Sequence, residues 1–184
     1  MEHHEEKNGP LAEAVALREA GRKEEARELL VALAARRPDD AEVAYQTAWA
    51  HDVLGLEAEA VPYYERALAK TETGTGNETG TGSTTSSPGL TPDDRRGALL
   101  GLGSTYRILG RYEDAVTLLT GAVEEFPEDG SLRTFLAMAL YNTGQHHESV
   151  RTLLRLLAAT SEDPSVREYR KAIEYYAEDL DATE

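Results

Sequence analysis

Cysteine is absent from the 184-residue chain, which excludes disulfide bridges, thiolate metal sites and cysteine nucleophiles. Long apolar runs are also absent, because no stretch approaches the ~20 residues that cross a bilayer. The chain begins MEHHEEKNGP, which lacks the apolar segment of a secretory signal peptide. We therefore expect a cytoplasmic protein without a membrane-spanning part.

Positive charge is scarce. The chain carries 19 Lys and Arg residues against 34 Asp and Glu residues, which gives a net charge of −15. A field of this sign repels the phosphate backbone of nucleic acids and the anionic surface of membranes. We therefore expect neither nucleic acid nor membrane among the partners.

Catalytic and metal-binding motifs are also missing. The sequence has no GxSxG motif, and its GTGNETG segment at residues 74–80 departs from the GxGxxG spacing and follows no strand. Adjacent histidines at His146 and His147 point in different directions if they start a helix, so they need further metal ligands from elsewhere. We predict no enzyme activity, no cofactor and no metal site. A hydrolase or metalloenzyme that uses these two histidines is the rival hypothesis.

The chain does contain helical periodicity, because apolar residues recur at intervals of three and four. One such run is Leu99, Leu102, Tyr106 and Leu109. Prolines and acidic residues stand where the runs begin. Thr91 and Asp163 can each cap a helix whose first residue is the following proline, Pro92 or Pro164. No alternating strand pattern of useful length occurs, so we predict an all-α chain.

Four similar segments indicate an internal repeat. They read EAGRKEEARELL, VLGLEAEAVPYY, ILGRYEDAVTLL and NTGQHHESVRTL. Their glycines are Gly21, Gly55, Gly110 and Gly144, at spacings of 34, 55 and 34 residues. A small residue follows five places after each glycine, at Ala26, Ala60, Ala115 and Ser149. We infer four repeats, with an insertion of 21 residues between the second and the third.

A helix-turn-helix period of 34 residues resembles the tetratricopeptide repeat family. The third copy, residues 96–129, carries the fullest match. Its matching residues are Leu102, Gly103, Tyr106, Gly110, Ala115, Ala122 and Pro127. The other copies, residues 7–40, 41–70 and 130–160, keep the turn glycine and most of the small positions. The resemblance covers residues 7–160.

The resemblance implies an all-α fold, a right-handed α-solenoid of four helical hairpins. The two helices of each hairpin, helix A and helix B, should cross closely at their small residues. Each repeat should leave an apolar face that its neighbour covers. Residues 164–181 should form an amphipathic C-terminal capping helix. Its apolar stripe is expected at Val166, Tyr169, Ile173, Tyr176 and Leu180.

Residues 71–91, rich in Thr, Gly and Ser, fall between helix B of the second repeat and helix A of the third. We interpret them as a flexible insertion, natural or engineered, that adds no core contact. A linker of this length also permits a domain swap, in which the second half of one chain docks on the first half of another.

Proteins of this family line the inner surface of the solenoid with helix A and bind extended peptides or helices there. The register of the repeats places a set of exposed groove residues on this surface. They are Arg18, Tyr45, Gln46, Trp49, Asp52, Ser104, Arg107, Thr134, Phe135, Met138, Tyr141 and Asn142. Aromatic and arginine side chains on one concave surface are typical of binding hot spots. In the alternative interpretation, Trp49 and Phe135 pack against neighbouring helices and the arginines form surface salt bridges.

We therefore predict a non-catalytic scaffold that binds a protein or peptide partner in the helix-A groove. The alternative is a self-associating structural protein that uses the same aromatic surface as a homo-oligomer interface. A monomer or a weak homodimer is the expected state.

Overall fold

The computed structural model describes residues 9–69 and 89–181, and within these ranges the chain forms ten helices and no strand. The helices are α1 Pro10–Glu19, α2 Lys23–Arg36, α3 Ala41–Asp52, α4 Glu57–Ala69, α5 Pro92–Ile108, α6 Tyr112–Glu125, α7 Gly130–Asn142, α8 His146–Thr160, α9 Pro164–Glu168 and α10 Arg170–Glu178. The chain divides into two compact units, Met1–Thr105 and Tyr106–Glu184, and the division falls inside α5. The insertion expected at residues 71–91 lies, up to residue 88, outside the described residues.

Side-chain caps start several of the helices, as the sequence predicted for two of them. The Thr91 hydroxyl accepts a hydrogen bond from the Asp94 amide at 3.1 Å, and α5 begins at Pro92. The Asp163 carboxylate accepts from the Ser165 amide at 2.8 Å, and α9 begins at Pro164. These caps satisfy amides that have no partner within the helix, and a proline there loses no hydrogen bond.

The same glycine turn ends α1, α3, α5 and α7. The glycines at 21, 55, 110 and 144 all have φ between 70° and 80°, a left-handed conformation that glycine adopts without steric cost. The amide that follows each glycine donates to a carbonyl five residues earlier, as from Arg111 to Tyr106 at 2.8 Å and from Gln145 to Leu140 at 2.9 Å. This pattern is the Schellman motif. Four copies of one turn confirm the four-fold repeat of the sequence.

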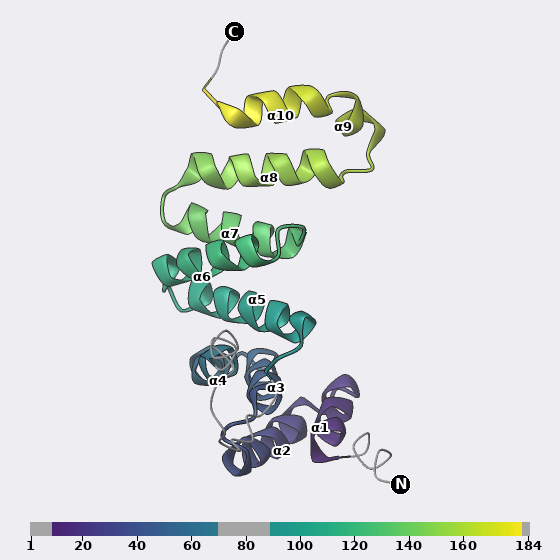
Figure 1. Cartoon of the computed structure of the whole chain (residues 1–184), viewed down its shortest axis with the longest axis vertical. Helices are drawn as coiled ribbons and strands as arrows, with labels where there is room; N and C mark the ends of the chain where they lie inside the picture. Colours follow the sequence, from purple (N-terminus) through teal and green to yellow (C-terminus); the bar gives the residue numbers. More distant parts are fainter. Residues whose placement is uncertain (1–8, 70–88, 182–184) are drawn as a thin grey trace, which may run out of the picture. The chain divides into compact units, whose positions relative to one another are not determined.

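Successive helices pack as hairpins, with α1 against α2, α3 against α4 and α7 against α8. Neighbouring hairpins meet through α2 and α3 in the first unit and through α6 and α7 in the second (Figure 1). The predicted small residues are buried where these helices meet; they are Ala14, Ala26, Ala48, Ala60, Ala115, Ala137 and Ser149. The Ser149 hydroxyl donates to the Ala137 carbonyl at 2.7 Å, so α7 and α8 are in close contact there. The predicted succession of all-α hairpins is thereby confirmed.

In the first unit, α5 lies against the second hairpin through two glycines. A Cβ atom at Gly101 would lie 2.6 Å from Cζ of Tyr64, and one at Gly97 would lie 3.1 Å from Cζ of Tyr45. Real Cβ atoms are not found as close as the first of these distances, so the tyrosine rings leave space only for glycine. The segments before and after the insertion therefore share one core.

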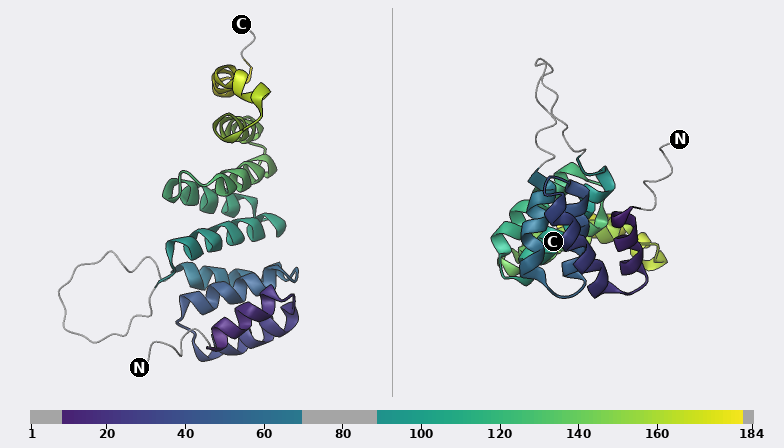
Figure 2. Two further views of the ribbon diagram at one scale, coloured as in Figure 1. Left: turned by 90° about the vertical axis from the view of Figure 1, so that its right-hand side faces the viewer. Right: turned by 90° about the horizontal axis from the view of Figure 1, so that it is seen from below.

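In the second unit, α7, α8 and α10 follow one another as layers (Figures 1 and 2). The expected capping helix forms as α9 and α10, with Tyr169 between them. The α8 residue Arg151 donates to the carbonyls of Ala177 and Glu178, each at 3.1 Å, and so caps the C-terminal end of α10. Arg155 holds the Glu178 carboxylate through both of its oxygens.

The apolar stripe expected on the capping helix is wrong at two positions. Tyr169 and Tyr176 are exposed, whereas Ala177 is fully buried and Ile173 is half-buried. Because alanine allows a closer helix contact than tyrosine, α10 packs on α8 through Ala177 and turns the two tyrosines outward.

Candidate functional site

Three of the expected groove residues contact one another in the first unit. Arg18 lies on α1, and its Nη1 donates to Oε1 of Gln46 on α3 at 2.7 Å. The guanidinium carbon lies 3.7 Å from the centroid of the Trp49 ring, one helical turn further along α3. Burial lowers the pKa of Arg18, although the guanidinium remains charged at neutral pH. The contact fixes one cation against a partly exposed aromatic ring.

The expected exposure of Tyr45 and Gln46 is wrong, because only 7% and 8% of these residues is accessible. Tyr45 stacks against Trp49 with ring centroids 6.0 Å apart and reaches Gly97 on α5, while Gln46 is held by Arg18. Burial is also the main reason why the pKa of Tyr45 is raised. Trp49 therefore packs against neighbouring side chains with part of its ring, and the rest of the ring faces solvent.

Asp52 binds other side chains of the first unit rather than projecting into solvent. Its carboxylate accepts from the Tyr64 hydroxyl at 2.6 Å and from the Thr105 hydroxyl at 3.0 Å. Burial raises the pKa of Asp52, and the two hydrogen bonds oppose this rise. Asp52 thus joins α3 to α4 and α5.

Sequence reasoning missed both partners of Asp52, and one signal pointed to Tyr64. Gly97 and Gly101 stand four residues apart inside a predicted helix, where glycine costs stability and usually marks a close approach. The side chains that approach are Tyr45 and Tyr64.

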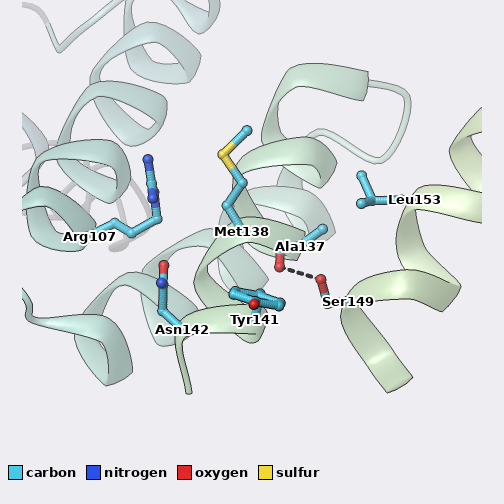
Figure 3. Close-up of a pocket in the computed structure, with 7 residues that line it drawn as sticks. All are labelled: Arg107, Ala137, Met138, Tyr141, Asn142, Ser149 and Leu153. Carbon is cyan, nitrogen blue, oxygen red and sulfur yellow. Dashed lines mark hydrogen bonds between the residues drawn. The ribbon is translucent and has the colours of Figure 1, made fainter. Parts of the chain in front are cut away.

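The second unit contains an open cavity of about 360 Å³ (Figure 3). It is lined by Arg107 from α5, by Ala137, Met138, Tyr141 and Asn142 from α7, and by Ser149 and Leu153 from α8. Four of these seven residues were expected in the groove, namely Arg107, Met138, Tyr141 and Asn142. The α8 residues were missed because the groove was assigned to helix A alone, although Ser149 was identified as a packing position.

The cavity combines apolar side chains with one cation. Met138, Tyr141 and Leu153 are large apolar or aromatic residues that remain exposed there. The Nε atom of Arg107 is buried and has no hydrogen-bond partner among the described residues. The Ser149 hydroxyl is already bonded to the Ala137 carbonyl (Figure 3). The cavity therefore offers an apolar surface beside an arginine that lacks an acceptor for its Nε hydrogen.

The remaining expected residues lie apart from this cavity. Ser104, Thr134 and Phe135 are half-buried, and the Thr134 hydroxyl donates to the Gly130 carbonyl at 2.7 Å. None of the three lines the cavity. Which of the twelve groove residues contact a partner stays a prediction.

The described residues include no group of three or more His, Cys, Asp or Glu side chains able to hold a metal ion. His147 lies 3.7 Å from Asp181, and both side chains are largely exposed. Among the helices described, none combines the length and the apolar character that a membrane crossing requires.

The chain was compared with individual curated proteins and with models of protein families. The search of curated proteins finds no match. The family model described as tetratrico peptide repeat matches residues 8–50 and 41–180, which together span most of the chain. Proteins built from this repeat are generally non-catalytic scaffolds for protein interactions. With its helical hairpins and four identical glycine turns, the chain belongs to the tetratrico peptide repeat family.

Proposed function

We propose that the chain is a non-catalytic scaffold that binds a protein or peptide, with the cavity of the second unit as its main contact site. The observation that carries this proposal is the combination of exposed Met138, Tyr141 and Leu153 with Arg107 around one hollow. Concave apolar sites with a few convergent polar groups are the usual form of a binding pocket.

The chemistry of the cavity favours a particular kind of segment. An apolar side chain of the partner would contact Met138 and Leu153, where both surfaces lose contact with water. A carbonyl or carboxylate beside that side chain would accept from the guanidinium group of Arg107, which lines the cavity. Aromatic and arginine residues contribute the largest share of binding energy in many interfaces, so Tyr141 and Arg107 are the expected anchors.

The Arg18–Trp49 contact gives the first unit a second candidate surface. Its guanidinium is already fixed by Gln46 and by the aromatic ring, so binding an acceptor there costs little further side-chain entropy. The guanidinium of Arg18 and the ring of Trp49 together suit a partner segment that carries a hydrogen-bond acceptor. We expect this surface to bind an acceptor group on its own, and the cavity of the second unit to provide most of the affinity.

The proposal is tested with a peptide obtained by selection from a random peptide library on the immobilised full-length chain. The affinity of the labelled peptide is then measured by fluorescence anisotropy for the wild type and for Tyr141→Ala and Arg107→Ala. Each substitution should weaken binding by about 1 to 3 kcal/mol, the range for a hot-spot residue. Circular dichroism checks that helicity is unchanged.

Tyr175→Ala is the matched control, because Tyr175 and Tyr141 are both 63% exposed and Tyr175 lies on α10, outside the cavity. This control should bind the peptide as the wild type does. Unchanged affinity in both cavity variants, or an equal loss in the control, would show that the peptide binds elsewhere.

A further inference from the structure

The repeat relates the cavity of the second unit to a set of residues in the first unit. Arg18 stands three places before the turn glycine of the first repeat, and Arg107 stands three places before that of the third. Trp49 and Met138 each stand six places before the turn glycine of the repeat that follows. The Arg18–Trp49 pair of the first unit and the Arg107–Met138 pair of the second therefore occupy equivalent positions.

The two pairs differ in what lies over the guanidinium. In the first unit, the guanidinium carbon of Arg18 is 3.7 Å from the centroid of the Trp49 ring. In the second unit, the thioether side chain of Met138 stands where the indole ring would be. Among the described residues, no aromatic ring forms a cation–π contact with Arg107. One of two equivalent arginines is thus covered by a ring and the other is not.

The opposite wall of the cavity also lacks its cover. The position nine places after the turn glycine holds Leu30, Tyr64 and Leu119 in the first three repeats, and none of them is more than 2% exposed. The fourth repeat has Leu153 there, which is 41% exposed and lines the cavity. Leucine is fully buried at this position in two other repeats, so the exposure of Leu153 reflects unfilled space beside it.

The unfilled space has the size and the walls for a planar ring. In Figure 3, the side chains of Arg107 and Leu153 lie on either side of Met138. The cavity that they line measures about 360 Å³, within the ~300–1,000 Å³ of pockets that hold small ligands. Ala137 and Ser149 are small, so they leave this space open. Met138 is unbranched and adapts its shape, and its sulfur makes favourable contacts with aromatic rings.

We propose that the partner inserts an aromatic side chain into the cavity and places its ring against the guanidinium of Arg107. The ring takes the place that Trp49 has beside Arg18 in the first unit. A guanidinium is attracted to the negative face of an aromatic ring, most strongly to that of tryptophan, so tryptophan is the expected anchor of the tightest partners. The ring also covers the apolar atoms of Met138 and Leu153. This inference rests on the proposed function and names the residue class that the site recognises.

The peptide selected from the random library provides the first test. Peptides selected on the wild-type chain should share an aromatic residue at one position. Replacing that residue by leucine should weaken binding at least ~10-fold in fluorescence anisotropy, as for the loss of a hot-spot anchor. Replacing a different apolar residue of the same peptide by leucine is the control, and it should change the affinity by less than about 3-fold.

Filling the cavity from the side of the chain is the second test. Met138→Trp gives Arg107 the ring that Arg18 already has, so it should weaken the selected peptide at least ~10-fold. Met138→Leu is the matched control, because it keeps an aliphatic side chain of similar volume and should bind within about 3-fold of the wild type. Met138 is 38% exposed, so both variants should fold, and circular dichroism checks their helicity.

A double-mutant cycle tests the contact between the ring and the cation. Arg107→Gln is combined with the peptide in which leucine replaces the shared aromatic residue. If the ring lies on the guanidinium, the loss from the two changes together should be smaller than the product of the single losses, by about 3- to 10-fold.

A peptide whose affinity falls with Tyr141→Ala but not with the loss of its own aromatic residue would overturn the aromatic anchor and leave the cavity as the binding site. So would equal affinities of Met138→Trp and Met138→Leu, or a cycle without coupling. Unchanged affinity in both Tyr141→Ala and Arg107→Ala is a different result, because it would place the peptide outside the cavity and remove the proposed site together with its anchor.

Discussion

The guanidinium of Arg18 lies over the ring of Trp49, with the guanidinium carbon 3.7 Å from the ring centroid. Gln46 fixes it from the side through a hydrogen bond of 2.7 Å. The contact joins α1 to α3 within the first unit, and Trp49 is the only tryptophan of the chain. Its fluorescence therefore reports on the packing of this unit without interference from the second.

Arg18→Ala should destabilise the first unit. The substitution removes the cation from the Trp49 ring and leaves the buried Gln46 amide without its donor, which together cost about 1 to 3 kcal/mol. Urea unfolding followed by Trp49 fluorescence measures the loss. Arg22→Ala is the control, because Arg22 is exposed and pairs with the exposed Glu25, three residues along the chain. Equal stability of the two variants would contradict the structural role of Arg18.

Gly101→Ala should destabilise the first unit by about 1 to 3 kcal/mol, the usual cost of overpacking a core. The new methyl group would overlap the ring of Tyr64, which is itself buried and hydrogen-bonded to Asp52. Urea unfolding followed by circular dichroism gives the free energy. The matched control is Gly121→Ala on α6, where a Cβ atom meets nothing within 4 Å.

That control should instead gain about 0.5 to 1 kcal/mol, because alanine is the better helix former. A gain in stability with Gly101→Ala as well would mean that Tyr64 does not occupy the space beside α5.

The pH dependence of stability should reveal the buried carboxyl of Asp52. Burial raises its pKa above the value of about 3.9 in an unfolded chain, so folding disfavours the ionised form. The stability that the protonated group contributes is complete below pH ~4 and is lost as the pH rises through the higher folded pKa. Asn does not titrate, so the wild type should lose stability relative to Asp52→Asn over this window.

Unfolding by urea, measured for both proteins at several pH values from about 3.5 to 7, checks this prediction. Trp49 fluorescence reports on the unit that contains Asp52. The difference between the two free energies of unfolding should shift in favour of the variant as the pH rises. A constant difference, or a shift in favour of the wild type, would contradict the raised pKa.

The repeat and its turns could be predicted from the sequence, because they depend on local chemistry. Gly21, Gly55, Gly110 and Gly144 end their helices in a conformation that only glycine adopts easily, so their spacing alone reveals the period. Caps at Thr91 and Asp163 follow from side chains within two or three residues of the amides that they bind.

The exposure of individual side chains was harder to predict, because it depends on what a neighbouring helix brings. Tyr45 and Gln46 stand at positions that face the groove in the repeat pattern, yet Gly97 and Arg18 bring them into the core. The apolar stripe on α10 was also misplaced, because the small Ala177 is buried against the neighbouring helix and the larger Tyr176 is exposed. Sequence periodicity places a face to within about one residue, and helix packing then selects the residue that fits.

Met138 provides the most direct test of binding in the cavity. The chain has two methionines, and the other is Met1, outside the described residues, so a methyl-labelled sample gives two methionine signals. A Met138→Leu sample assigns them. Titration with the selected peptide should move the Met138 methyl signal along a saturation curve with the same Kd as the anisotropy measurement. A peptide that binds with measurable affinity while the Met138 methyl signal stays in place would contradict the cavity as the binding site.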